Sequence, residues 1–170
     1  EAKRLTAESD DIRTALTQLV GDHLWQQGQM QKPVLAAYLF ASPEHAAQVN
    51  AIIHPAVRRD FLRWTDAHSR SPVVAIESAI LCESGFHTLV DSILLVDAPL
   101  EVRLQRAMLR DGACRQQVMA RMARQDSAQA RQLARFTVTN DGGNDQLLQA
   151  CLESIVTQLQ AEAGAMQDNK

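Results

Sequence analysis

Apolar positions in the first part of the chain recur at the spacing of an α-helix. Ile12, Leu16 and Leu19 fall on one face of such a helix, and Gly21 interrupts the pattern. Residues 9–11, Ser-Asp-Asp, suit a helix start, because their side chains accept hydrogen bonds from the open N–H groups of a first turn. We therefore expect a helix that begins near residue 10 and ends before the glycine.

Further helices are expected before residue 70. Residues 34–40 form a short apolar run, and residues 42–44, Ser-Pro-Glu, are typical of a helix start with proline in the first turn. That helix is expected to end at His54-Pro55, because proline disfavours helical geometry in the residue before it. Another helix is expected over residues 57–67, so the first 70 residues are predicted to be mostly helical.

The pattern changes after residue 71, where short apolar runs replace the helical spacing. These runs cover residues 73–76, 92–96 and 137–140. Continuous apolar runs suit strands buried on both faces, as in a parallel sheet. A helix with one apolar stripe is expected over residues 145–161, and the tail from Gly164 is expected to fray. Alternating strands and helices predict an α/β fold with a parallel sheet sandwiched by helices.

Polar residues stand at the carboxyl ends of all three predicted strands. They are Glu77, Asp97 and Asn140. Ligands of open parallel sheets bind beyond these ends, so the three side chains are candidates for a binding site. A strand-end acid can also cap the next helix, and for Asp97, which precedes Ala98-Pro99, we favour that structural role.

Charge is unevenly distributed along the chain. Residues 103–135 carry eight arginines and two acids, a local net charge of +6, whereas the 170-residue chain has a net charge of −3. The planar guanidinium fork matches phosphate oxygens, so this segment is a candidate phosphate-binding region. A solvated helical face is the alternative. Nucleic acid is not expected as a partner, because Phe136, just past the end, is the one aromatic residue near the segment.

Composition narrows the class of protein further. Hydrophobic residues make up 46% of the chain, which is typical of a globular protein, and no apolar stretch is long enough to cross a membrane. Cys82, Cys114 and Cys151 lie far apart without a C-x-x-C pair. This favours reduced thiols in the cytoplasm over disulfides or structural zinc. The five histidines are scattered and suggest no nucleophilic triad.

Three stretches of the chain together resemble the dephospho-coenzyme A kinase family. The first is G-Q-M-Q-K-P-V-L-A-A-Y-L-F-A-S-P-E at residues 28–44, which leads to N-A-I-I-H-P at 50–55. The second is V-V-A-I-E-S-A-I-L-C-E-S-G at 73–85. The third is I-L-L-V-D-A-P-L-E-V-R-L-Q-R-A-M-L-R-D-G at 93–112, followed by T-V-T-N-D-G at 137–142. Their order and spacing match the family over nearly the whole chain.

The resemblance implies a P-loop kinase that uses ATP to phosphorylate the ribose 3′-hydroxyl of dephospho-coenzyme A, the last step of coenzyme A synthesis. It implies a P-loop NTPase-type sheet with a helical substrate insert and an arginine-bearing lid. Residues 1–70 would then form the substrate-binding region, 71–102 and 136–163 the core, 103–135 the lid and 164–170 a frayed tail. Its partners would be small molecules, without nucleic acid or membrane.

One family motif is missing from the chain. The G-x-x-x-x-G-K-[ST] loop, whose backbone amides and lysine hold the ATP phosphates, does not occur in these residues. Glu1 falls near the second acid of the family's D-x-D pair, so we expect the chain to be N-terminally incomplete and inactive as given. Glu77 also stands where most members carry Asp. Ala79 replaces a usual proline and Cys82 a usual aromatic residue.

The resemblance assigns the lid-base arginines to ATP. Arg103, Arg106 and Arg110 share one stripe of the predicted helix after residue 97. Arg106 is the best candidate for a catalytic contact to the ATP phosphates, with a surface ion pair as the alternative. Arg110 would either lie near adenine or pair with Asp111.

Other candidates come from the same resemblance. Asn140 and Gly142 match the loop that borders adenine, although Asn-Asp-Gly is also ordinary turn chemistry. His54 matches the His-Pro at the edge of the substrate insert, although a histidine before proline often just terminates a helix.

The acceptor side of the reaction is assigned to acids. Glu77 and Glu83 are candidate substrate contacts near the acceptor ribose, and Glu77 could also hold a water bound to Mg²⁺. The acceptor hydroxyl needs a general base, which would belong to the acidic pair at or before Glu1. ATP is therefore the expected cosubstrate and Mg²⁺ the expected metal, and the sequence points to no residue as a direct ligand of the ion.

Two alternatives remain open at the level of sequence. One is another P-loop kinase that acts on a nucleoside or nucleotide, against which the early helical insert and the His-Pro argue. The other is a non-catalytic helical binding module derived from a kinase, which a native gene without the P-loop would favour.

Overall fold

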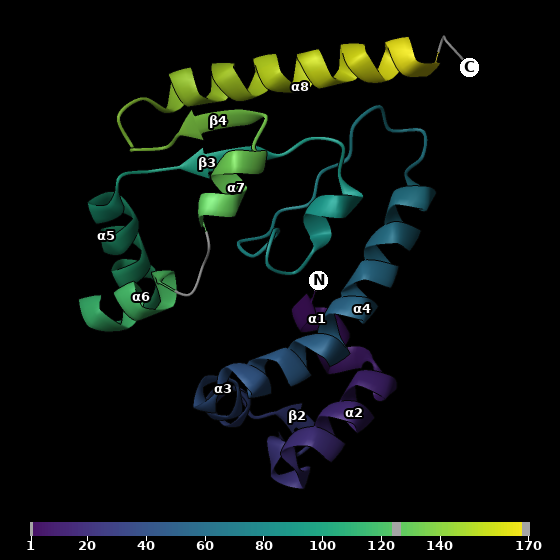
Figure 1. The fold of residues 1–170 in the computed structure, drawn as a ribbon, viewed down its shortest axis with the longest axis vertical. Helices are drawn as coiled ribbons and strands as arrows, with labels where there is room; N and C mark the ends of the chain where they lie inside the picture. Colours follow the sequence, from purple (N-terminus) through teal and green to yellow (C-terminus); the bar gives the residue numbers. More distant parts are fainter. Residues whose placement is uncertain (1, 124–126, 168–170) are drawn as a thin grey trace. The chain divides into compact units, whose positions relative to one another are not determined.

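The computed structural model describes residues 2–123 and 127–167, and its chain divides into two compact units (Figure 1). Unit 1 is Glu1–Ser69 and unit 2 is Arg70–Lys170. Within the described residues, no helix has the length and apolar character that a membrane span requires. The proposed division into substrate region, core and lid stays a prediction.

Unit 1 is built almost entirely from helices, as the apolar spacing predicts. Its elements in chain order are α1 (Ala2–Glu8), α2 (Asp10–Val20), the short 3-10 helix η1 (Asp22–Leu24), β1 (Trp25–Gln26), β2 (Gln29–Met30), α3 (Lys32–Ala41) and α4 (Pro43–Ala67).

The helix starts of unit 1 are fixed by side-chain caps. Ser9 Oγ accepts a hydrogen bond from the Ile12 N–H at 3.4 Å, and Ser42 Oγ accepts one from the His45 N–H at 3.2 Å. Each cap satisfies a backbone donor that the first helical turn leaves open. Both predicted helix starts are therefore confirmed.

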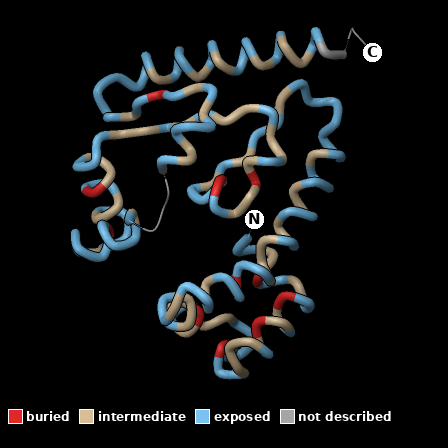
Figure 2. Tube along the Cα trace, viewed as in Figure 1, coloured by how far each residue is buried: buried red, intermediate tan, exposed pale blue. Residues whose placement is uncertain are grey.

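One hydrophobic core holds unit 1 together. Its buried members come from α2, η1, α3 and α4 and are Ile12, Leu16, Leu24, Leu35 and Val49. In Figure 2 the buried positions of this unit, in red, are spread over several of its helical segments. Removal of this apolar surface from water is the main force that folds the unit.

A single long helix replaces the two that proline was expected to separate. α4 runs through His54 and Pro55 without a break, so the predicted helix end at this site is wrong. Pro55 lacks the N–H that would bond the Ala51 carbonyl, which normally disfavours a proline inside a helix. Ile52, Ile53 and Ala56 pack against the core on both sides of the proline and offset that loss.

Unit 2 contains a parallel strand pair covered by helices. Its elements are the 3-10 helix η2 (Phe86–Leu89), β3 (Leu94–Asp97), α5 (Leu100–Asp111), α6 (Arg115–Met122), α7 (Ser127–Leu133), β4 (Phe136–Thr139) and α8 (Asp145–Gln167). β3 pairs with β4 in parallel, with Leu94 opposite Phe136 and Asp97 opposite Thr139. α8 runs alongside β4, which confirms the predicted α/β fold with a parallel sheet and flanking helices (Figure 1).

Two sequence-based expectations for unit 2 are wrong. Residues 73–76 form no strand, because an apolar run becomes a strand only where a neighbouring strand accepts its hydrogen bonds. The expected frayed tail is instead helical as far as Gln167, so α8 includes Gly164. Residues 168–170 lie outside the described part of the chain.

Buried side chains in unit 2 are spread over separate elements. Leu104 and Val118 are completely buried, one on α5 and one on α6, and Val138 is buried on β4. Cys82 is buried just before η2, and Phe86 is buried at its first position. Figure 2 shows these positions as isolated sites along the chain.

Candidate functional site

The carboxyl ends of the two parallel strands bring Asp97 and Asn140 together. The Asn140 N–H donates to the Asp97 carbonyl at 2.8 Å, directly after the last paired residues of β3 and β4. This bond extends the ladder by one step and holds the loop that follows β4 against the end of β3. The strand-end location is where open parallel sheets bind their ligands.

Arg106 reaches this loop from α5. Its Nη1 donates to the Asn140 carbonyl at 2.7 Å and its Nη2 donates to Asn140 Oδ1 at 3.2 Å. The two residues are 34 positions apart in the sequence. A guanidinium has five N–H donors, and the hydrogen bonds to Asn140 use two of those of Arg106.

Gly142 completes this arrangement because a side chain would not fit. Its φ of +86° lies in the left-handed region that favours glycine, and a Cβ would lie 3.1 Å from Arg106 Nη2. Three predicted ATP-site residues, Arg106, Asn140 and Gly142, thus meet at one edge of the sheet. Arg106 is exposed, so its charge is open to an anion from solvent.

Asp97 acts differently from the expected helix cap. Pro99 is the N-cap residue of α5 and makes no side-chain cap, whereas Asp97 Oδ1 accepts from the Ala98 N–H at 2.9 Å. Its Oδ2 accepts from Arg131 Nη2 of α7 at 2.6 Å. The Arg131 hydrogen bond, aided by the Ala98 N–H, holds the pKa of Asp97 below its usual value. Asp97 therefore ties α7 to the end of β3.

Arg103 fixes the base of α5 at the same place. Its Nε donates to the Ala98 carbonyl at 2.9 Å. The bond joins the first turns of α5 to the β3–α5 connection, and it orients the arginine stripe that carries Arg106.

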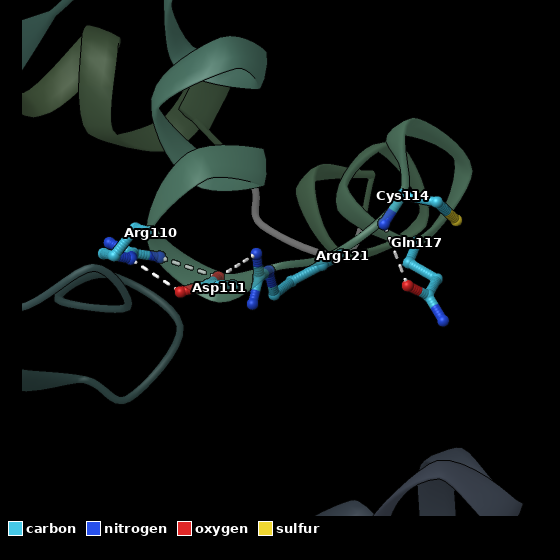
Figure 3. Close-up of polar contacts among 5 residues, drawn as sticks. All are labelled: Arg110, Asp111, Cys114, Gln117 and Arg121. Carbon is cyan, nitrogen blue, oxygen red and sulfur yellow. Dashed lines mark hydrogen bonds and ion pairs between the residues drawn. The ribbon is translucent and has the colours of Figure 1, made fainter.

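Arg110 lies on the same helix and pairs with Asp111, whereas its predicted place on the ATP side stays a prediction. Its Nε and Nη2 donate to the two carboxylate oxygens of Asp111 at 2.7 and 3.1 Å. Arg121 of α6 donates from Nη2 to Asp111 Oδ2 at 2.6 Å (Figure 3). Hydrogen bonds from Arg110 and then from Arg121 hold the pKa of Asp111 well below its usual range.

The predicted substrate residues lie elsewhere in the chain. His54 is half-buried inside α4 of unit 1, and burial lowers its pKa. Glu77 and Glu83 are exposed in the irregular segment before η2. The premise that Glu77 ends a strand is wrong, because residues 73–76 form no strand. Glu1, the proposed catalytic acid, lies outside the described residues.

Carboxylates do not gather into a metal site in the described ranges. Within residues 2–123 and 127–167, no three histidine, cysteine or acidic side chains come close enough to hold an ion. Asp97 and Asp111, two acids of this unit, already accept hydrogen bonds from guanidinium groups.

Sequence patterns missed the partners of these arginines. Arg131 and Arg121 were part of the basic segment, but their targets, Asp97 and Asp111, depend on how α6 and α7 return to β3 and α5. The sequence shows only that arginines outnumber acids in this segment. That excess indicates neither which ion pairs form nor which arginines remain available to a ligand.

The parallel strand pair with its flanking helices makes this an α/β protein, and Arg106 of α5 contacts the loop at the carboxyl end of that pair. Comparison with known proteins narrows this class. The Dephospho-CoA kinase family model matches residues 1–146. The chain therefore belongs to the dephospho-CoA kinase family, and neither another nucleotide kinase nor a non-catalytic module is favoured.

Individual relatives agree with the family match. A Dephospho-CoA kinase of Bacteroides fragilis (strain YCH46) is 44% identical over 143 residues, which cover 84% of this chain and 70% of that protein. A Dephospho-CoA kinase of Deinococcus radiodurans is 34% identical over 135 residues, covering 78% of this chain and 65% of that protein.

Solved structures share the fold. A crystal structure from Thermus thermophilus has a TM-score of 0.74 at 30% identity, covering 93% of this chain and 80% of that one. The Dephospho-CoA kinase from Campylobacter jejuni has a TM-score of 0.64 at 19% identity, covering 95% and 82%, and supports the fold alone.

Proposed function

We propose that the encoded protein transfers the γ-phosphoryl group of ATP to the ribose 3′-hydroxyl of dephospho-CoA, with Arg106 as the residue that meets the charge of the transferring group. Membership of the dephospho-CoA kinase family supports the reaction. The observation that carries the role of Arg106 is its double hydrogen bond to Asn140 at the carboxyl edge of the sheet.

The arginine suits phosphoryl transfer on physical grounds. This reaction asks little covalent chemistry of a protein and depends on positioning and on charge stabilisation. Asn140 holds the guanidinium at 2.7 and 3.2 Å before any ligand arrives, so its orientation need not be organised during the reaction. Arg106 is exposed and has further N–H donors that phosphate oxygens can accept from, as the role requires.

Other residues take supporting roles in this proposal. Asn140 and Gly142 border the adenine, and Arg110 contributes to the ATP side. His54, Glu77 and Glu83 contact dephospho-CoA, and the acceptor hydroxyl loses its proton to an acid at or near Glu1. These assignments rest on the family resemblance of the residues.

We further propose that Mg²⁺ enters with ATP in a cytoplasmic enzyme. Mg²⁺ is commonly held by one or two carboxylates together with phosphate oxygens and water. The described acids near the arginines do not fit the role of its ligands, because guanidinium groups occupy Asp97 and Asp111. We therefore derive no step through the ion. Cysteines without disulfides support the cytoplasmic location.

The test replaces Arg106 by lysine in the encoded protein. Arg106→Lys keeps the charge and loses the fork, so turnover with ATP and dephospho-CoA should fall on the order of a hundredfold. The KM for dephospho-CoA should change far less, since the contact serves the transition state. Arg63→Lys, at an exposed site in unit 1, is the matched control.

Steady-state kinetics and melting curves of both variants decide the outcome. Near-normal turnover in Arg106→Lys would show that Arg106 is a surface arginine. A wild-type protein that does not phosphorylate dephospho-CoA would overturn the reaction itself.

A further inference from the structure

Two arginines from two helices converge on one carboxylate at the end of α5. Asp111, the last residue of α5, accepts two hydrogen bonds from Arg110 and a third from Arg121 of α6. Figure 3 shows the two guanidinium groups on either side of this carboxylate. We call these three residues the Asp111 cluster.

We propose that Asp111 is a positioning residue that aligns Arg110 and Arg121 into a site for a phosphate group of the nucleotide. The inference rests on the proposed function and extends it to a residue that the family resemblance left without a role. Asp111 touches neither substrate nor reacting atoms in this proposal, and it acts through the two arginines.

The backbone of the cluster is fixed by features outside it. Gly112, with a φ of 61°, ends α5 in a left-handed turn, and the Cys114 N–H donates to Gln117 Oε1 at 3.1 Å, which starts α6 (Figure 3). α6 packs against α5, and Leu104 and Val118 are both fully buried. The positions of the two arginine backbones are thus set by packing, which leaves their side chains for Asp111 to order.

The charges leave room for an anion. Two guanidinium groups and one carboxylate carry a net charge of +1, and the cluster uses three of the ten N–H donors of its arginines. The Arg110 and Arg121 side chains are 73% and 45% exposed, against 25% for Asp111. The carboxylate lies inward and the arginines lie outward, as an anion site at the surface requires.

Asp111 could instead weaken phosphate binding by its negative charge. Two considerations favour alignment over this competing effect. Water screens Coulomb forces between groups as exposed as these, so the repulsion of a phosphate by Asp111 is small. Without the carboxylate, the two arginine side chains regain the rotamers that a ligand must then order again.

The same two helices supply an internal control. Glu101 of α5 accepts two hydrogen bonds from Arg115 of α6, both at 2.7 Å. This pair has the chemistry of the Asp111 cluster and joins the same helices, but it brings only one arginine to its carboxylate. A merely structural ion pair between α5 and α6 would therefore respond alike at Glu101 and at Asp111.

The experiment compares Asp111→Asn with Glu101→Gln in the encoded protein. ATP and inorganic tripolyphosphate are titrated by calorimetry, and KM and kcat are measured for both substrates. In Asp111→Asn, the affinity for both anions should fall on the order of tenfold, in line with the loss of charge-assisted hydrogen bonds. The KM for dephospho-CoA should stay near the wild-type value, Glu101→Gln should bind ATP normally, and Asp111→Glu should restore most of the affinity.

Coupling between residues gives a second measurement. In an Arg121→Gln background, Asp111→Asn should cost much less than it does alone, because one of the two aligned arginines is already gone. If Asp111→Asn alone is poorly folded, Arg121→Gln alone decides the proposal, because the loss of one aligned arginine should weaken tripolyphosphate binding and unchanged binding would overturn the site.

Three results would overturn the positioning role. They are unchanged or tighter ATP binding in Asp111→Asn, an equal loss in Glu101→Gln, and full additivity with Arg121→Gln. Failure of the wild-type protein to phosphorylate dephospho-CoA would instead count against the proposed function. In that case the tripolyphosphate titration would still decide whether Asp111 aligns the two arginines.

Discussion

Unit 1 and unit 2 are stabilised by different interactions. In unit 1, buried apolar side chains from α2, η1, α3 and α4 form one cluster. In unit 2, the buried side chains sit singly on α5, α6 and β4, and ion pairs connect the elements. These pairs join Arg115 to Glu101, Arg121 to Asp111, Arg131 to Asp97 and Arg135 to Glu162.

The two units therefore differ in how easily their stabilising contacts can rearrange. A hydrophobic core loses much free energy when its packing is disturbed, whereas an exposed ion pair contributes little to stability. The exposed arginines of unit 2 can therefore adjust to a phosphate at low cost while their carboxylates keep them aligned. The apolar core of unit 1 offers no such adjustment.

The largest expected effect is on the core of unit 1. Leu16→Ala leaves a cavity at a fully buried site, and unfolding should be easier by about 2–5 kcal/mol. Urea unfolding is followed by far-UV circular dichroism, since both units contain helices. Leu109→Ala in α5, where the side chain is 86% exposed, should leave stability nearly unchanged. Similar losses in the two variants would contradict the comparison.

A smaller effect is expected at the strand-end loop of unit 2. Gly142→Ala forces a left-handed residue to carry a Cβ next to Arg106, with a local cost of about 1–2 kcal/mol. kcat/KM for ATP should fall on the order of tenfold, which corresponds to that cost. Gly164→Ala within α8 meets no atom within 4 Å, so activity should stay normal and stability should rise slightly. Full activity of Gly142→Ala would remove the loop from the site.

A pH effect is expected in unit 1. Burial lowers the pKa of His54 below 6.5, its value in an unfolded chain. As the pH falls, the unfolded chain binds the proton first, so this contribution to stability is complete above about pH 6.5 and declines below it. His54→Gln cannot take up a proton and should flatten this slope in urea unfolding at about pH 7.5 and 5.5. An equal pH dependence of stability in the two proteins would mean that burial does not disfavour the charged form of His54.

The smallest effect concerns the exposed pair between Arg135 and Glu162. Hydrogen bonds from Arg135 and then Gln158 lower the pKa of Glu162 from 4.5 to about 2. The pair stabilises the fold above pH 4.5, and its contribution is lost as the pH falls through about 2. An NMR titration of the Glu162 carboxyl should show a return toward 4.5 in Arg135→Gln. Little change in stability should accompany it, because exposed ion pairs contribute little.

Local chemistry made part of the fold predictable. Ser9 and Ser42 start helices because their own side chains bond the next turn. The apolar runs at residues 92–96 and 137–140 were correctly predicted to be strands. In the fold they become β3 and β4, which pair with one another. Residues 73–76 have similar composition without a paired strand, and a single sequence does not contain that information.

Contacts across the fold were the part that sequence could not supply. Helix α4 passes Pro55 because Ile52, Ile53 and Ala56 pack on the core, which no local rule for proline includes. Arg106 was proposed from its match to the family's lid-base arginines, but its bonds to Asn140 follow from the parallel register of β3 and β4.

Because Cys82 is buried, its reaction with a thiol reagent reports when the surrounding segment of the chain opens. Cys114 and Cys151 are exposed, whereas Cys82 is buried beside η2 at 5% exposure. A maleimide therefore alkylates two thiols of the folded protein and reaches the third only when the segment around η2 opens. Intact-mass spectrometry would read this opening as a step from two adducts to three, so the rate of the third alkylation is the opening rate of a single segment within unit 2.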